Sequence, residues 1–200
     1  MPARVAKAAN LKGKHMIDRL FIVTSLLALL AGCGSGSDDK GSANHEDDSL
    51  TIVAPTSAWT IVADPYASGA ESPAKNLQGT VVSVVVSDKD AADWGVKPST
   101  TTLVSLSGLK PSTGFMAHVH LLACADTLGG GHYQNVPGGP ADATNEIWFN
   151  LMSDSAGVAS AETVVPWAVR AGEAKSVVVH DMVKNAEGKL PKLACQDLAF

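Results

Sequence analysis

The sequence predicts an all-β domain over residues 51–200, either a sandwich or a barrel. From Ser49 onward, short runs rich in β-branched residues alternate with clusters of Gly, Pro, Ser and Asp, as in strands joined by turns. No long segment keeps a 3.6-residue hydrophobic period, so helices are not expected to carry the fold. A domain of about 150 residues is long enough to bury a hydrophobic core.

Eight short strands are expected in this domain. They cover 59–63, 79–87, 101–106, 115–121, 146–151, 158–165, 176–180 and 192–198. Turn signals such as Pro137-Gly138-Gly139 separate them. The best helical candidate is 161–174, but Pro166 and the Val164-Val165 pair argue against a helix there.

The first 32 residues have the pattern of an export signal. An apolar stretch over 20–32 follows five basic residues and is too short to cross a bilayer, which takes about 20 residues. Its end, Leu30-Ala31-Gly32-Cys33, resembles a bacterial lipobox and implies a lipid on Cys33. The alternative is an ordinary signal peptide with an incidental cysteine. Translation could begin at Met1 or at Met16, since the segment from Met16 is itself a complete lipoprotein signal.

Residues 33–50 are expected to form a disordered tether between the lipid and the domain. The stretch 34–49 has no apolar residue larger than alanine and is rich in Gly, Ser and Asp. The protein is therefore expected to contact the membrane through the lipid on Cys33. Gly34 after that cysteine favours the outer membrane, with the domain facing the periplasm.

The charge of the chain excludes nucleic acid as an expected partner. The net charge is −5, and loss of residues 1–32 removes five basic residues and one acidic residue, which leaves −9. An acidic domain without a basic run has no electrostatic surface for phosphates.

Four of the six histidines lie in contexts that favour a metal site. His118 and His120 alternate along one strand, so both imidazoles project from the same face. His132 follows a triple-glycine turn, and His180 ends a valine run. Two metals stay open: a closed four-histidine zinc site would be structural, whereas copper would add redox chemistry.

The cysteines support an exported protein. Of the three, lipidation of Cys33 leaves Cys124 and Cys195. In an oxidising compartment such a pair is expected to form a disulfide rather than two free thiols.

Several short motifs follow one another across the domain. They are Gly108-Leu109-Lys110-Pro111, His118-Val119-His120, Gly131-His132-Tyr133, Val179-His180-Asp181 and Lys192-Leu193-Ala194-Cys195. In this order they resemble the copper–zinc superoxide dismutase family. The resemblance implies an eight-stranded Greek-key β-barrel or sandwich with long metal-binding loops. It also implies that His118, His120, His132 and His180 bind one copper ion and that Cys124 pairs with Cys195.

The chain departs from that family in ways that favour its copper-only branch. No histidine lies between His132 and His180, so the zinc site is expected to be absent. Glu146 and Asp181 are candidates for holding the second ring nitrogens of the ligands; for Glu146 the alternative is a surface charge at the start of a strand. Lys192 replaces the family's arginine and is expected to attract an anion, or else to be a solvated lysine.

The resemblance implies an enzyme that converts superoxide into dioxygen and hydrogen peroxide in the cell envelope. His132 and Lys192 would be its catalytic residues, with superoxide as the substrate. A non-catalytic copper-binding or copper-delivery lipoprotein of the same fold is the alternative, and a metal-free structural lipoprotein is a third. The sequence does not set the oligomeric state.

Overall fold

A computed structural model describes residues 50–185 and 187–200. The expected signal segment 1–32, Cys33 and the tether up to residue 49 lie outside these residues. Within the part that is described, no helix has the length and apolar character needed to cross a membrane.

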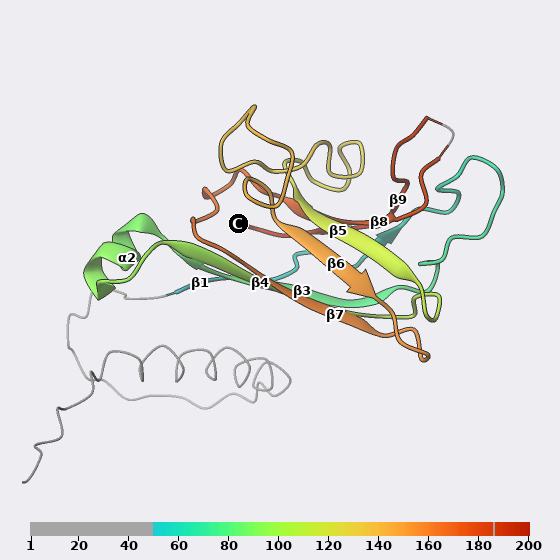
Figure 1. The fold of residues 1–200 in the computed structure, drawn as a ribbon, viewed down its shortest axis with the longest axis horizontal. Coiled ribbons are helices and arrows are strands. Elements are labelled where there is room, and N and C mark those ends of the chain that lie inside the picture. Colours follow the sequence, from blue (N-terminus) through green and yellow to red (C-terminus); the bar gives the residue numbers. More distant parts are fainter. Residues whose placement is uncertain (1–49, 186) are drawn as a thin grey trace, which may run out of the picture. The chain divides into compact units, whose positions relative to one another are not determined.

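The described residues form two antiparallel sheets and one short helix. The elements are β1 (Thr51–Val53), β2 (Thr60–Ile61), β3 (Gln78–Val86), α2 (Asp88–Trp94), β4 (Ser99–Ser107), β5 (Gly114–His120), β6 (Trp148–Met152), β7 (Ala159–Val165), β8 (Ser176–Asp181) and β9 (Lys192–Asp197). One sheet has the order β1-β3-β4-β7 and the other the order β2-β9-β8-β5-β6. Figure 1 shows them as two layers, which is compatible with a β-sandwich. Strand pairing among the described residues does not close them into a barrel.

The core lies between the two sheets and is built from alternate residues of each strand. In β5, Phe115, Ala117 and Val119 are fully buried in this core. The facing sheet contributes Val81, Val85, Val104 and Leu106. Because side chains alternate along a strand, the even-numbered residues of β5 project from the outer face of the five-stranded sheet.

All eight expected strands are present, with ends shifted by at most two residues, but the expected number is one too small. The additional strand is β1, which pairs with β3 at the edge of the four-stranded sheet. It has only three residues, too few for an alternating pattern to be recognised. The segment 161–174 is not helical; it begins within β7, as Pro166 and the valine pair indicate.

Helix α2 was not expected from the sequence, although its ends carry recognisable signals. Ser87 caps the first turn: its side chain accepts a hydrogen bond from the Asp90 backbone, and the Asp90 carboxylate accepts one from the Ser87 backbone. Gly95 ends the helix with a left-handed φ of 63°. Seven residues are too few to show a 3.6-residue period, so these caps were the only local evidence.

The turn after β4 depends on Gly108. Its φ is +72°, and a Cβ at this position would lie 2.0 Å from the backbone oxygen of Asn76. Gly172 has almost the same φ of +75°, but no atom lies within 4 Å of the place of its Cβ. Alanine substitutions at these two positions would therefore share the cost of backbone strain, but only the one at Gly108 would add the cost of a steric clash.

We expect Gly108→Ala to destabilise the protein more than Gly172→Ala. The left-handed backbone should cost about 1–2 kcal/mol in both variants. The clash with Asn76 should add about 1–3 kcal/mol in Gly108→Ala alone. Urea unfolding of the two variants measures the difference, and equal losses would contradict the close approach at Gly108.

Candidate metal centre

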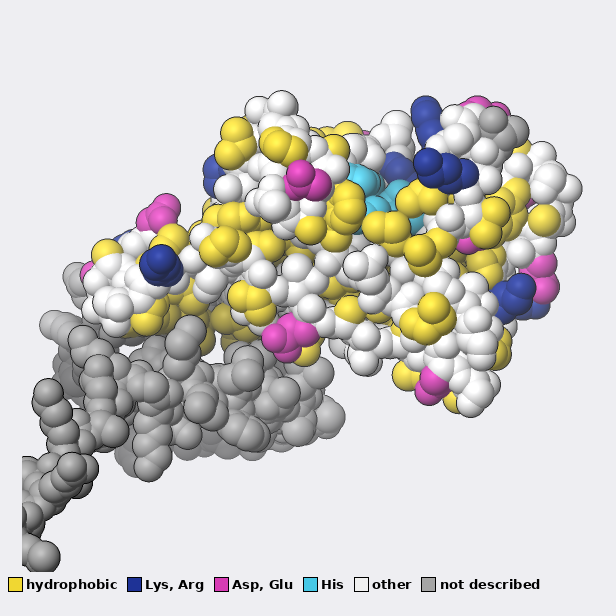
Figure 2. All heavy atoms as spheres, viewed as in Figure 1, with side chains coloured by type: hydrophobic (Ala, Val, Ile, Leu, Met, Phe, Trp, Pro, Cys, Tyr) yellow, Lys and Arg dark blue, Asp and Glu magenta, His cyan; other side chains and the backbone are white. Residues whose placement is uncertain are grey.

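The structure brings together the four histidines that the sequence singles out. One ring nitrogen from each of His118, His120, His132 and His180 lies within 4.8 Å of the others. His118 and His120 lie on β5, and His180 lies on the neighbouring strand β8. Figure 2 shows histidine atoms at the surface of this face, so the cluster is not sealed from solvent.

His132 reaches the cluster because its loop folds back along β5. The Tyr133 backbone donates to the Val119 oxygen at 2.9 Å, and the Leu121 backbone donates to the Gly131 oxygen at 3.0 Å. The Tyr133 ring is fully buried in the core and fixes the residue next to the ligand. His132 is therefore anchored by the core although it lies in a loop.

The glycines before His132 permit this close approach, as the triple-glycine turn indicated. A Cβ on Gly129 would lie 2.7 Å from Oγ of Ser176 and 3.1 Å from Cβ of His120. Gly129 has a φ of +84° and Gly130 a φ of +65°. Side chains at Gly129 would push the loop away from β5.

Burial keeps three of the four imidazoles neutral. Desolvation, followed by the neighbouring histidines, lowers the pKa of His118 to about 2. Desolvation is also the main cause that lowers the pKa of His120 to about 3 and that of His180 to about 4. The neutral imidazole is the form that binds a metal, so folding prepares these groups as ligands.

His118 carries the clearest indication of a missing partner. It is buried, and neither of its ring nitrogens has a hydrogen-bond partner among the described residues. A buried polar atom without a partner is costly unless a further group binds it. Four imidazoles with converging nitrogens are a donor set that fits copper or zinc.

Hydrogen bonds to the other rings orient their free nitrogens toward one another. Nδ1 of His120 lies 3.2 Å from the Gly130 oxygen, and Nδ1 of His180 lies 3.4 Å from the Leu190 oxygen. The Nε2 atoms of His120 and His180 then lie 3.4 Å apart. A backbone acceptor on one ring nitrogen leaves the other for a metal.

Glu146 holds His132 in the same way. One of its carboxylate oxygens, Oε2, lies 2.6 Å from Nδ1 of His132 and accepts a hydrogen bond from Nε1 of Trp148 at 2.7 Å. Oε1 accepts from Nε2 of Gln134 at 3.0 Å. Glu146 is only 2% exposed, so it is not a surface charge.

Gln134 and Trp148 were not identified from the sequence. Trp148 lies opposite His118 in the β5–β6 register, and the two rings have centroids 5.3 Å apart. Its position two residues after Glu146 was a usable signal, because i and i+2 side chains share a face in extended chain. Gln134 had no such signal, since its contact depends on the path of the loop.

Asp181, the other acidic candidate, is not brought to the histidines. Its side chain accepts hydrogen bonds from the Tyr66 hydroxyl and from the Val183 backbone. Burial and this contact raise the pKa of Tyr66. Asp181 follows His180 directly in β8, so the two side chains point to opposite faces. Nδ1 of His180 faces the Leu190 backbone oxygen instead of the Asp181 carboxylate that was expected from the sequence.

Lys192 is bound to the loop rather than solvated. Its Nζ donates to the backbone oxygens of Thr127, Leu128 and Gly130 at 3.1, 2.9 and 2.8 Å. Burial lowers the pKa of Lys192. The Gly130 oxygen also lies 3.2 Å from Nδ1 of His120, so Lys192 and His120 share this backbone acceptor.

Cys124 and Cys195 lie at disulfide-bonding distance, as expected, with their Cα atoms 5.6 Å apart and a sequence separation of 71. The bridge ties the loop after β5 to β9. The Cys124 backbone also donates to Oδ1 of Asp197 at 2.7 Å.

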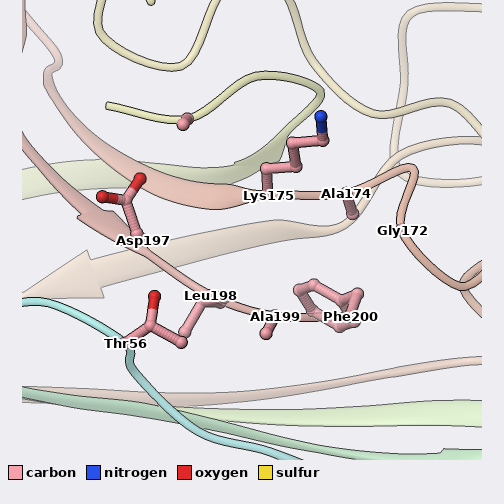
Figure 3. A pocket seen from close by; sticks show the side chains of 9 residues that line it. Thr56, Gly172, Ala174, Lys175, Asp197, Leu198, Ala199 and Phe200 are labelled. Atoms are coloured by element: carbon pink, nitrogen blue, oxygen red, sulfur yellow. The ribbon is translucent and has the colours of Figure 1, made fainter. Parts of the chain in front are cut away.

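A surface pocket near the C-terminus is separate from the cluster. Figure 3 shows Asp197, Lys175 and Phe200 among the side chains that line it. None of the four histidines lines this pocket. Asp197, which lines the pocket, accepts a hydrogen bond from the backbone of Cys124.

We expect His118→Leu to abolish metal binding at little cost to the metal-free protein. The substitution replaces a buried ring with no hydrogen-bond partner by an apolar side chain, so the free energy of unfolding should change by less than about 1.5 kcal/mol. Metal titration with Cu²⁺ and Zn²⁺ checks the first part, and urea unfolding checks the second. His45→Leu removes a histidine that is not one of these four, and the variant should still bind one equivalent. A loss of stability without a loss of binding would contradict the role of His118.

Glu146→Gln should weaken metal binding by about 10- to 100-fold, the usual effect of losing an acceptor behind a ligand imidazole. The amide keeps the shape of the side chain but loses the charge beside His132. Glu162→Gln is the matched control, because Glu162 is exposed on β7. Competition with a chelator of known affinity gives both dissociation constants, and equal values for the two variants would show that the carboxylate does not act on the ligand.

A scan against models of known protein families finds no match to the chain, and a search of curated proteins finds none either. The function is therefore inferred from the contacts of the four-histidine cluster.

Proposed function

We propose that the chain is a copper-binding superoxide dismutase of the cell envelope, similar to the copper-only branch of the copper–zinc superoxide dismutase family. The observation that carries the proposal is the cluster itself. His118 is buried without a partner among imidazoles whose outer nitrogens are anchored. His132, in contrast, is 30% exposed, so a small molecule can reach one edge of the cluster.

The path of the chain supports the finer part of this proposal, a Greek-key arrangement. In the five-stranded sheet β5 lies between β8 and β6, while β7 belongs to the other sheet. A Greek key, in which the fourth strand returns beside the first, would account for the pairing of β8 with β5. The motif places HVH on β5 and His180 on β8 side by side.

The cluster suits copper better than a structural zinc ion. Neutral imidazoles accept both metals, but divalent copper binds nitrogen sites more tightly than zinc does. Structural zinc sites are closed, whereas the edge at His132 is open. Glu146 already occupies Nδ1 of His132, the nitrogen that a second, bridging metal would need.

Bound copper would supply one-electron chemistry, taking an electron from one superoxide to release dioxygen and giving it to a second superoxide that leaves as hydrogen peroxide after taking up two protons. The residues of the chain would hold the ion and orient its ligands. His118, His120 and His180 are neutral and held by the sheet. Glu146 fixes the orientation of His132, the most accessible ligand.

Lys192 would attract superoxide through its charge. The positive charge of its ammonium is one of the causes that lower the pKa of His120 and of His180, so Lys192 raises the electrostatic potential at the cluster. A local positive charge can guide a small anion even on an acidic protein. Because the ammonium already serves three backbone oxygens, this guidance acts through space.

The same contacts of Lys192 favour a second candidate function, copper binding or delivery without turnover. An ammonium with three backbone acceptors has no free N–H for a bound anion. A protein of this kind would keep the cluster and its affinity but would convert superoxide poorly.

The place of action is proposed from the N-terminal sequence and the cysteine pair. A lipid on Cys33 would hold the domain at the outer membrane, facing the periplasm. The Cys124–Cys195 pair is consistent with an oxidising compartment.

Loading the full-length protein with copper should produce superoxide disproportionation, whereas zinc loading and metal-free protein should give none. The rate should fall as salt concentration rises, since screening weakens attraction of the anion. Measurement of metal content and of superoxide decay on one preparation tests this expectation. Copper bound at one equivalent without turnover would overturn the enzyme and favour the binding protein.

Lys192→Gln tests whether the positive charge of Lys192 attracts superoxide. It should lower the copper-dependent rate by several-fold at low salt, and its rate should depend less on salt than that of the wild type. Lys192→Arg keeps the charge and should keep the salt dependence.

A further inference from the structure

A group of methionines lies beside the histidine cluster on the same face of the five-stranded sheet. The described residues contain three methionines, Met116, Met152 and Met182. Met116 and His118 are alternate residues of β5, so both project from the outer face. Met116 also lies opposite His180 in the β5–β8 register. The group therefore borders two of the four histidines.

Gly114 brings the other two methionines together. Met152 lies opposite Gly114 in the β5–β6 register. A Cβ on Gly114 would lie 2.8 Å from Sδ of Met182 and 3.6 Å from Cε of Met152, so both side chains extend over this glycine. Met116 follows two residues later on the same face, within reach of long side chains. All three thioethers can converge next to the cluster.

These methionines are unusual in their exposure. Met152 is 68% exposed and Met182 is 52% exposed, although both side chains are apolar. Gly114 does not have a positive φ, so the backbone does not require glycine there. Its absent side chain instead leaves the space that Sδ of Met182 occupies. Figure 2 shows hydrophobic side chains beside the exposed histidine atoms on this face.

Thioether sulfur is a soft ligand that carries no charge and does not titrate. Among first-row metals such ligands select the cuprous ion, whereas Zn²⁺ and Cu²⁺ prefer imidazole. We propose that Met116, Met152 and Met182 form a second metal site, which binds Cu(I) next to the four-histidine cluster. The choice of copper rests on the proposed function, but the binding of Cu(I) by these sulfurs does not require turnover.

The proposal is tested with full-length protein that carries ¹³C-labelled methionine methyl groups. Cu(I), held reduced by ascorbate without oxygen and buffered with bicinchoninate, is compared with Zn²⁺. Single Met→Leu variants assign the three signals. Cu(I) should shift the methyl signals of Met116, Met152 and Met182, and Zn²⁺ should leave them in place.

Two further variants keep the test independent of folding and of the histidines. The triple variant Met116→Leu, Met152→Leu, Met182→Leu conserves volume and apolarity, so it should unfold like the wild type but bind one equivalent of Cu(I) less. Gly114→Ala keeps all three sulfurs but places a Cβ 2.8 Å from Sδ of Met182, so this side chain must shift, and the variant should weaken the additional Cu(I) equivalent.

The failure of this site can be distinguished from the failure of the enzyme. In His120→Ala, which damages the four-histidine cluster, Cu(I) should still shift the methionine signals. Unshifted signals, or an unchanged number of Cu(I) ions in the triple variant, would overturn the methionine site whatever the superoxide assay gives. Signals that shift with protein concentration instead of Cu(I) would also overturn it, because the face would then contact a second copy.

Discussion

The alternation of side chains along β5 is the constraint on which the rest of the site depends. Phe115, Ala117 and Val119 fill the core between the sheets, and this burial determines which residues face outward. His118 and His120 then project together from the opposite face. A shift of the register by one residue would expose the aromatic and aliphatic groups and bury the imidazoles in the core. The hydrophobic effect therefore positions the clustered histidines, although none of them belongs to the core cluster.

Three different interactions hold the loop that carries His132. Tyr133 packs into the core directly beside the ligand. The Cys124–Cys195 bridge ties the loop to β9. Lys192, also on β9, binds three backbone oxygens of the same loop. A covalent bond, an apolar contact and hydrogen bonds from an ammonium group thus restrict one segment, which lowers the conformational entropy that binding would otherwise cost.

Local sequence patterns were sufficient for those features that depend on neighbouring residues. The β-branched runs located the long strands, and the spacing of His118 and His120 indicated a shared face. Asp181 was a weaker choice because strand alternation already places it opposite His180. The contacts of Lys192 and Gln134 could not be derived in this way, since they depend on the path of a long loop whose glycines permit many conformations. Strand β1 and helix α2 are too short to show a period.

The four clustered histidines come from three separate segments between residues 118 and 180. No short peptide can hold the set, and an unfolded chain presents four separate imidazoles with ordinary affinities. Metal that binds the folded state and not the unfolded chain therefore adds its free energy of binding to the stability of the fold. For this protein, a substitution distant from the histidines that unfolds part of the population should also lower the apparent affinity for the metal, whereas one that leaves the protein folded should not.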